Sequence, residues 1–168
     1  MDYNPCMFHI VLVEPEIPQN TGNIIRSIAA TGAILHLIEP LGFQMDEKHL
    51  RRAGLDYFPL ANILIHPSFE EYEARYPEFR KFFFSSHATQ SFTEVSYQDG
   101  DHLVFGKESV GLSKEIVERY SSNLVRIPMK KEARCINLSN AVAVGLFFAL
   151  YQNGFPGLES SSPDPYLP

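Results

Sequence analysis

Six short apolar runs, separated by stretches with helical spacing, constrain the fold of this chain more than any other feature. The runs are predicted to be β-strands at residues 9–14, 34–39, 62–66, 81–86, 102–106 and 124–128. Helices are predicted at residues 20–31, 46–53, 68–75, 113–119 and 137–152. Several runs are apolar at nearly every position, as expected for strands buried on both faces of a parallel sheet. The pattern therefore predicts a three-layer α/β domain with a mostly parallel sheet flanked by helices.

The length of the chain fits one such domain. A protein of 168 residues can bury a substantial core. We expect a single domain over residues 1–157 and a flexible tail over 158–168, because the end of the chain is rich in serine and proline. Either Met1 or Met7 can be the start of translation.

Signals for export and for membrane insertion are weak. The longest apolar run, residues 141–151, is too short to cross a bilayer. The N-terminal apolar run has no cationic segment before it, unlike a signal peptide. The two cysteines, Cys6 and Cys135, are far apart and form no CxxC pair. We therefore expect a cytoplasmic protein without a membrane segment, a disulfide framework or a zinc site.

The net charge of −6 argues against nucleic-acid binding through overall charge. Two local basic clusters, KHLRR and MKKEAR, remain as candidate phosphate contacts, although each can equally be a solvated face. Their cationic side chains are Lys48, Arg51, Arg52, Lys130, Lys131 and Arg134.

Several common catalytic and binding motifs are excluded. No GxGxxG follows a predicted strand, so a Rossmann dinucleotide site is unsupported. GKES places Glu108 where a P-loop needs serine or threonine, and Lys107 replaces the first glycine of a nucleophile elbow. The six histidines form no HExxH or i,i+4 pair, and we interpret His9 and His36 as hydrogen-bonded strand residues. A metal site or a hydrolytic triad is therefore not indicated.

Three segments follow the ends of predicted strands, where parallel α/β sheets bind ligands. The first, residues 14–27, offers Asn20 or Thr21 as a helix cap and carries Arg26. The second, residues 103–116, contains a glycine-bracketed turn. The third, residues 126–140, leads into the last helix, which Asn137 or Ser139 can cap. Each segment alone is explained equally well as a turn or a cap.

Together, these segments resemble one family. The motifs NTGNIIR, EPLGF…LRRAGLDY, YQDGD, FGKESVGL and IPM…NLSNAVAV are similar to those of the SPOUT, or α/β-knot, RNA methyltransferases. Within that class the chain resembles the TrmL-type tRNA 2′-O-methyltransferases over residues 7 to about 157. The resemblance implies a C-terminal trefoil knot, which is otherwise nearly absent from proteins. It also implies S-adenosylmethionine as methyl donor, S-adenosylhomocysteine as product, and no metal.

The resemblance also implies roles for particular residues. Catalytic roles fall on Arg26, Asn20, Glu108 and Asn137. Arg26 would act as general base or, because a guanidinium stays protonated in nearly all proteins, would grip the phosphate and stabilise the forming alkoxide. Glu108 is the alternative proton acceptor. Cofactor contacts fall on Phe84, Gly106, Ile127, Met129, Cys135 and Leu138. Serine is expected more often than cysteine at position 135.

The implied partners are tRNA and a second copy of the chain. The helix at 137–152 is apolar on every side from 141 to 151, so it must be buried all round, either in a monomer core or in a dimer. Gly145 within it suggests a close crossing. The resemblance favours a homodimer formed by this helix and the first one, with each site completed by the other subunit. The six basic side chains named above would hold the RNA.

The implied reaction is methylation of the wobble nucleotide 34, a cytidine or modified uridine, in leucine tRNAs. Two alternatives stay open: a SPOUT enzyme for another tRNA or ribosomal RNA position, and a non-catalytic RNA- or nucleotide-binding module. A flavodoxin-like domain is less consistent with this sequence, because the two prolines after the first strand disfavour a phosphate-binding loop.

Overall fold

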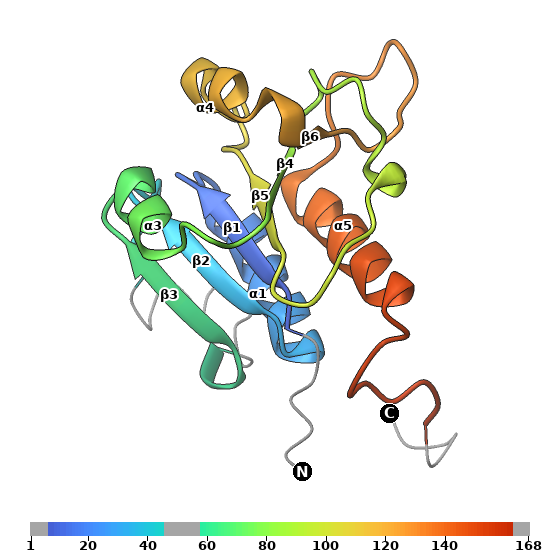
Figure 1. The fold of residues 1–168 in the computed structure, drawn as a ribbon. Coiled ribbons are helices and arrows are strands. Elements are labelled where there is room, and N and C mark those ends of the chain that lie inside the picture. The colour runs from blue at the N-terminus through green and yellow to red at the C-terminus, as the bar shows by residue number, and fades with distance from the viewer. Residues whose placement is uncertain (1–6, 46–57, 163–168) are drawn as a thin grey trace.

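The protein contains one six-stranded parallel sheet. The computed structural model describes residues 7–45 and 58–162. Its strands are β1 (His9–Val13), β2 (Ile34–Ile38), β3 (Asn62–His66), β4 (Lys81–Phe84), β5 (His102–Phe105) and β6 (Leu124–Val125). They pair in the order β3-β2-β1-β5-β4-β6, and every pair is parallel (Figure 1). All six predicted strands are confirmed.

Four α-helices lie in the described residues. They are α1 (Pro18–Thr31), α3 (Phe69–Arg75), α4 (Lys114–Arg119) and α5 (Leu138–Gln152). Short 3₁₀ turns are found at η1 (Phe58–Leu60), η2 (Phe92–Glu94) and η3 (Ser121–Asn123). Four predicted helices are thus confirmed, while the one predicted at 46–53 falls outside the described residues.

The start of α1 differs from the prediction. The helix begins at Pro18, after Ile17, whose side chain makes no capping hydrogen bond. Proline suits this first position because its fixed φ matches the helix and it needs no N–H partner there. Asn20 and Thr21 were expected as caps, but they lie inside the first turn and are buried. Asn20 is consequently available for other contacts.

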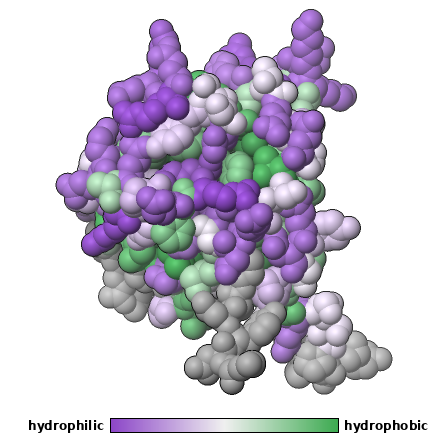
Figure 2. Space-filling view, viewed as in Figure 1, coloured by the Kyte–Doolittle hydropathy of each residue, from purple (hydrophilic) through white to green (hydrophobic). Residues whose placement is uncertain are grey.

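Alternate residues of each strand face two separate cores. Ile10 and Leu12 of β1 belong to the core that contains residues of α1 and α5. Val11 and Val13 belong to the other core, with residues of α3 and α4. Helices therefore cover both faces of the sheet, as predicted. The surface in Figure 2 is mainly hydrophilic, with apolar side chains in recessed areas between projecting polar ones.

The N-terminal half of α5 is fixed by a cap and a close packing contact. Asn137 Oδ1 accepts hydrogen bonds from the backbone N–H groups of Ser139 (3.0 Å) and Asn140 (3.3 Å), which identifies the cap. A Cβ on Gly145 would lie 3.0 Å from Cζ of Phe84 and 3.4 Å from Cζ of Phe105. Glycine therefore lets the helix lie directly against these rings, which accounts for a residue that costs about 1 kcal/mol relative to alanine.

Within one chain, α5 is exposed along one stripe, so its predicted burial in a monomer core is wrong, while its burial in a dimer stays a prediction. Val144, Phe147 and Tyr151 form an outward stripe and are 42%, 43% and 68% exposed. The rest of the helix packs against the sheet and α1. No helix in the described part of the chain is long and apolar enough to span a membrane.

The predicted tail is only partly described. Leu158 packs against the core, and residues 163–168 lie outside the described residues. Flexibility of the tail stays a prediction.

Candidate functional site: a pocket formed by three loops

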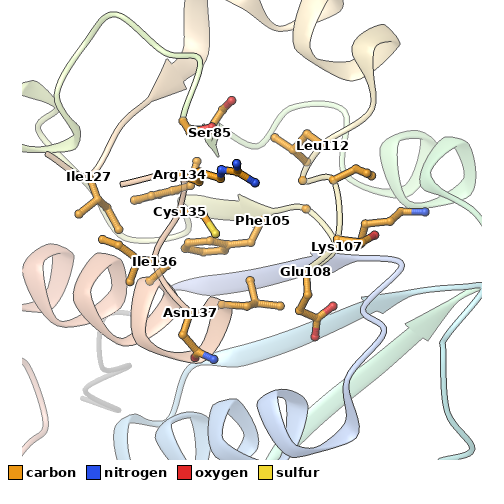
Figure 3. A pocket seen from close by; sticks show the side chains of 18 of the residues that line it. Ser85, Phe105, Lys107, Glu108, Leu112, Ile127, Arg134, Cys135, Ile136 and Asn137 are labelled. Atoms are coloured by element: carbon orange, nitrogen blue, oxygen red, sulfur yellow. The ribbon is translucent and has the colours of Figure 1, made fainter. Parts of the chain in front are cut away.

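A pocket of about 440 Å³ lies beyond the carboxyl ends of β4 and β5. Its walls come from the loop after β4, the loop after β5, and the segment between β6 and α5 (Figure 3). The cofactor contacts that the resemblance implies come from these three segments, among them Phe84, Gly106 and Ile127. All six predicted cofactor-contacting residues line it: Phe84, Gly106, Ile127, Met129, Cys135 and Leu138.

Three of the predicted catalytic residues form one hydrogen-bonded chain along the pocket. Asn137 Nδ2 donates to Asn20 Oδ1 at 3.0 Å, and Asn20 Nδ2 donates to Glu108 Oε1 at 3.2 Å. The three residues belong to the start of α5, to α1 and to the loop after β5. The chain therefore connects three segments that are far apart in the sequence.

The Glu108 carboxylate accepts two further hydrogen bonds at the entrance to α1. The backbone N–H of Glu16 donates to Oε2 at 2.7 Å, and that of Ile17 donates to Oε1 at 3.0 Å. Together with Asn20, three donors hold this carboxylate in place.

The fourth predicted catalytic residue, Arg26, lies on α1, the helix that also carries Asn20. It lies on the exposed side of α1, and the lining of the pocket within the described residues does not include it.

The predicted RNA-binding residues have different positions. Arg134 lines the pocket beside Cys135, which is exposed (Figure 3). Lys130 and Lys131 are exposed on the same segment. The other three, Lys48, Arg51 and Arg52, lie outside the described residues.

Sequence reasoning missed the residues that attach the loop after β5 to the segment after β1. Lys107 Nζ lies 2.5 Å from Glu14 Oε2, and Glu16 Oε1 accepts hydrogen bonds from Ser109. The hydrogen bonds of Ser109 lower the pKa of the Glu16 carboxyl, while the bond to Glu14 raises the pKa of Lys107. Both segments had been singled out, but the sequence contains no signal that pairs these side chains.

Histidines form a second polar group on the α3 face of the sheet. His36 Nε2 lies 2.8 Å from His9 Nδ1, and His36 Nδ1 lies 2.9 Å from His66 Nε2. His102 Nδ1 contacts the hydroxyl of Tyr72 at 2.6 Å, and its Nε2 is buried without a partner. One nitrogen each of His9, His36 and His102 lies within 4.8 Å of the others, a spacing that could hold a metal ion.

Burial keeps these histidines neutral. It lowers the pKa of His36 to about 3 and that of His102 to about 2. The contacts between ring nitrogens suit neutral imidazoles, in which one nitrogen donates and the other accepts. His9 and His36 are thus hydrogen-bonded strand residues, as the sequence interpretation held.

Comparisons with known proteins show the family to which the chain belongs. Residues 7–147 match the SpoU rRNA Methylase family. The tRNA (cytidine(34)-2′-O)-methyltransferase of Polaromonas sp. (strain JS666) is 50% identical over 154 residues, 90% of this chain and 94% of the relative. The protein of that name from Escherichia coli (strain K12) is 48% identical over 153 residues, 90% of this chain and 97% of the relative.

Solved structures share the fold. One that concerns the 2-OH methylation of C/U34 on tRNA has a TM-score of 0.85 and 42% identity, and the match covers 90% of this chain and 99% of the other. The SpoU methyltransferase AviRb from Streptomyces viridochromogenes, in complex with the cofactor AdoMet, has a TM-score of 0.77 and 25% identity. That match covers 89% of this chain and 59% of AviRb.

Proposed function

The chain belongs to the SpoU rRNA Methylase family, and on this premise we propose that it methylates the ribose 2′-hydroxyl of nucleotide 34 in tRNA. We propose leucine tRNAs carrying cytidine or a modified uridine at that position, S-adenosylmethionine as methyl donor, and a cytoplasmic location. The observation that carries this proposal is the pocket, in which three loops meet at the carboxyl ends of β4 and β5.

The residues of the pocket fit this methyl donor. Phe84, Ile127, Met129 and Leu138 provide apolar walls for an adenine ring. At Gly106 a Cβ would lie 2.1 Å from the carbonyl carbon of Gly111, so backbone alone can form that wall. Backbone N–H and C=O groups of the three loops can bind the polar edges of the ligand. S-adenosylmethionine supplies an electrophilic methyl group on its sulfonium.

The chain of Asn137, Asn20 and Glu108 keeps the loop after β5 and the start of α5 in fixed positions around the ligand. Transfer of a methyl group to a hydroxyl oxygen needs the two reactants in line, and such positioning can lower the barrier by several kcal/mol. We assign these three residues to positioning.

Arg26 would act at the pocket of a second copy of the chain. We propose a homodimer that buries the α5 stripe of Val144, Phe147 and Tyr151 together with part of α1, since α1 and α5 pack side by side. An arginine on the exposed side of α1 would then lie near the dimer interface. Its guanidinium can hold a phosphate bidentately and stabilise the alkoxide that forms on the ribose as the 2′-hydroxyl proton passes to Glu108 or to solvent.

The basic residues would contact the RNA backbone. Arg134 at the pocket and Lys130 and Lys131 on the same segment are placed to bind phosphates near the target ribose. Lys48, Arg51 and Arg52 would extend this surface. We also propose the C-terminal trefoil knot, which the order β5-β4-β6 and the convergence of the three loops support.

One experiment tests the activity. The protein is incubated with labelled S-adenosylmethionine and either total tRNA or ribosomal RNA, and the modified ribose is mapped by mass spectrometry. Label at position 34 is expected. Label at another position would show that the enzyme modifies a different nucleotide from the one proposed. No label in tRNA or ribosomal RNA would favour a non-catalytic binding protein.

A further inference from the structure

The loop that follows β5 depends on its surroundings for its position. All seven residues from 106 to 112 line the pocket. The loop folds back on itself, with the N–H of Gly111 donating to the carbonyl of Lys107 at 2.9 Å. It has no helix or strand of its own beyond one isolated bridge between these two residues. Contacts from outside must therefore orient it.

Two carboxylates connect this loop reciprocally to the segment before α1. The Glu108 carboxylate accepts from the backbone of Glu16 and Ile17, as described above. In the opposite direction, Glu16 Oε1 accepts from Ser109 Oγ at 2.6 Å and from the Ser109 backbone N–H at 2.9 Å. Each segment thus supplies one glutamate carboxylate that accepts hydrogen bonds from the other segment. The two sets of bonds keep the segments from moving apart and from sliding past each other.

We infer that Glu16 is a positioning residue for the methyl donor, holding the 106–112 loop in its binding shape and connecting it to the start of α1. This inference rests on the proposed function. Because α1 begins at Pro18, the same contacts that orient the loop also orient the helix that carries Asn20 and Arg26.

The chemistry of the pair favours an effect on the loop and not on the whole fold. The hydrogen bonds of Ser109 lower the pKa of Glu16, so the carboxylate is the form that they stabilise. Hydrogen bonds to an ionised acceptor are stronger than those between neutral groups. Glu16 is half-buried and Ser109 is exposed, so a substitution leaves no buried polar group without a partner.

The test compares Glu16→Gln, Ser109→Ala, the double variant and Ser109→Thr. Binding of S-adenosylmethionine is measured by calorimetry, and kcat and KM are measured with tRNA. We expect each of the first two variants to raise Kd and KM for the methyl donor about five- to tenfold, in the range of the net contribution of one typical hydrogen bond. KM for tRNA and Tm should stay unchanged.

The double variant should lose less affinity than the sum of the two single losses, because both substitutions weaken the hydrogen bond from Ser109 Oγ to Glu16 Oε1. Ser109→Thr keeps the hydroxyl and should bind as the wild type does. Glu118→Gln is the matched control, since Glu118 is an exposed acid paired with Lys114 on α4, away from the pocket lining.

Wild-type affinity in Glu16→Gln, or additive losses in the double variant, would overturn the inference. If Glu16→Gln does not fold, the comparison of Ser109→Ala with Ser109→Thr decides the question. A wild-type protein that binds no S-adenosylmethionine would instead overturn the proposed function, so the two failures are distinguishable.

Discussion

Acid is expected to destabilise this protein through the buried histidines on the α3 face of the sheet. Burial lowers the pKa of His36 to about 3 and that of His102 to about 2, while an unfolded chain has histidines with pKa of about 6.5. The pKa values of His9 and His66 are lowered too, chiefly by burial. As the pH falls below 6.5, the unfolded state therefore takes up protons that the folded state does not.

The sign and size of this pH dependence follow from the linkage between proton binding and folding. Stability from these groups is complete above pH 6.5 and is lost as the pH falls toward the folded pKa values. Between pH 7.5 and 5, His36 and His102 should each remove about 2 kcal/mol, or about 4 kcal/mol together. Around the cluster, Lys81 and Arg75 further disfavour protonation, whereas Asp99 and Glu71 favour it at His9 and His66.

The assay is urea unfolding followed by circular dichroism at several pH values from 7.5 to 5. We expect the free energy of unfolding to fall by about 4 kcal/mol over this range. His102→Phe should lose about half of this dependence, whereas His87→Gln, at an exposed histidine outside the cluster, should retain it. A free energy that stays constant down to pH 5 would refute the reasoning, as would full pH dependence in His102→Phe.

Three other predictions concern the pocket and the dimer. Arg26→Ala should abolish methyl transfer while S-adenosylmethionine still binds normally in calorimetry; wild-type turnover would remove Arg26 from the mechanism. Gly145→Ala should lower the unfolding free energy by up to about 2 kcal/mol, because displacing the Phe84 ring costs about 1–3 kcal/mol and the better helix propensity of alanine offsets about 1 kcal/mol; a raised melting temperature would show that the ring moves freely. Phe147→Asp should shift the protein from dimer to monomer in sedimentation velocity, and a wild-type protein that sediments as a monomer at micromolar concentration would contradict the proposed dimer.

Local patterns were enough to predict the strands and most helices. The burial of an apolar run such as residues 9–14 can be predicted from its sequence alone. Its side chains are more stable out of water, wherever the strand lies in the fold. The segments at the strand ends were also recognisable, since parallel strands bring their carboxyl ends to one edge. The positions of Phe84, Gly106 and Ile127 in the pocket follow from this rule together with the family resemblance.

Other features came only from the folded chain. The start of α1 at Pro18 moved Asn20 from an expected cap to a link between Asn137 and Glu108. The exposed stripe on α5 could not be predicted, because the helix is apolar on every side and its sequence does not distinguish the exposed side from the buried ones. In both cases the residue type was known, but its neighbours were not.

The physical reason is the range of the interactions involved. Helix and strand formation depend on spacing along a few consecutive residues, which can be read from the amino-acid order. The contact between Glu16 and Ser109 joins residues 93 positions apart, and the histidine contacts join three neighbouring strands. Glutamate, serine and histidine favour no such partner by themselves. Only packing of the sheet and its loops brings these atoms within hydrogen-bonding distance, and it thereby determines the pKa values and the shape of the pocket.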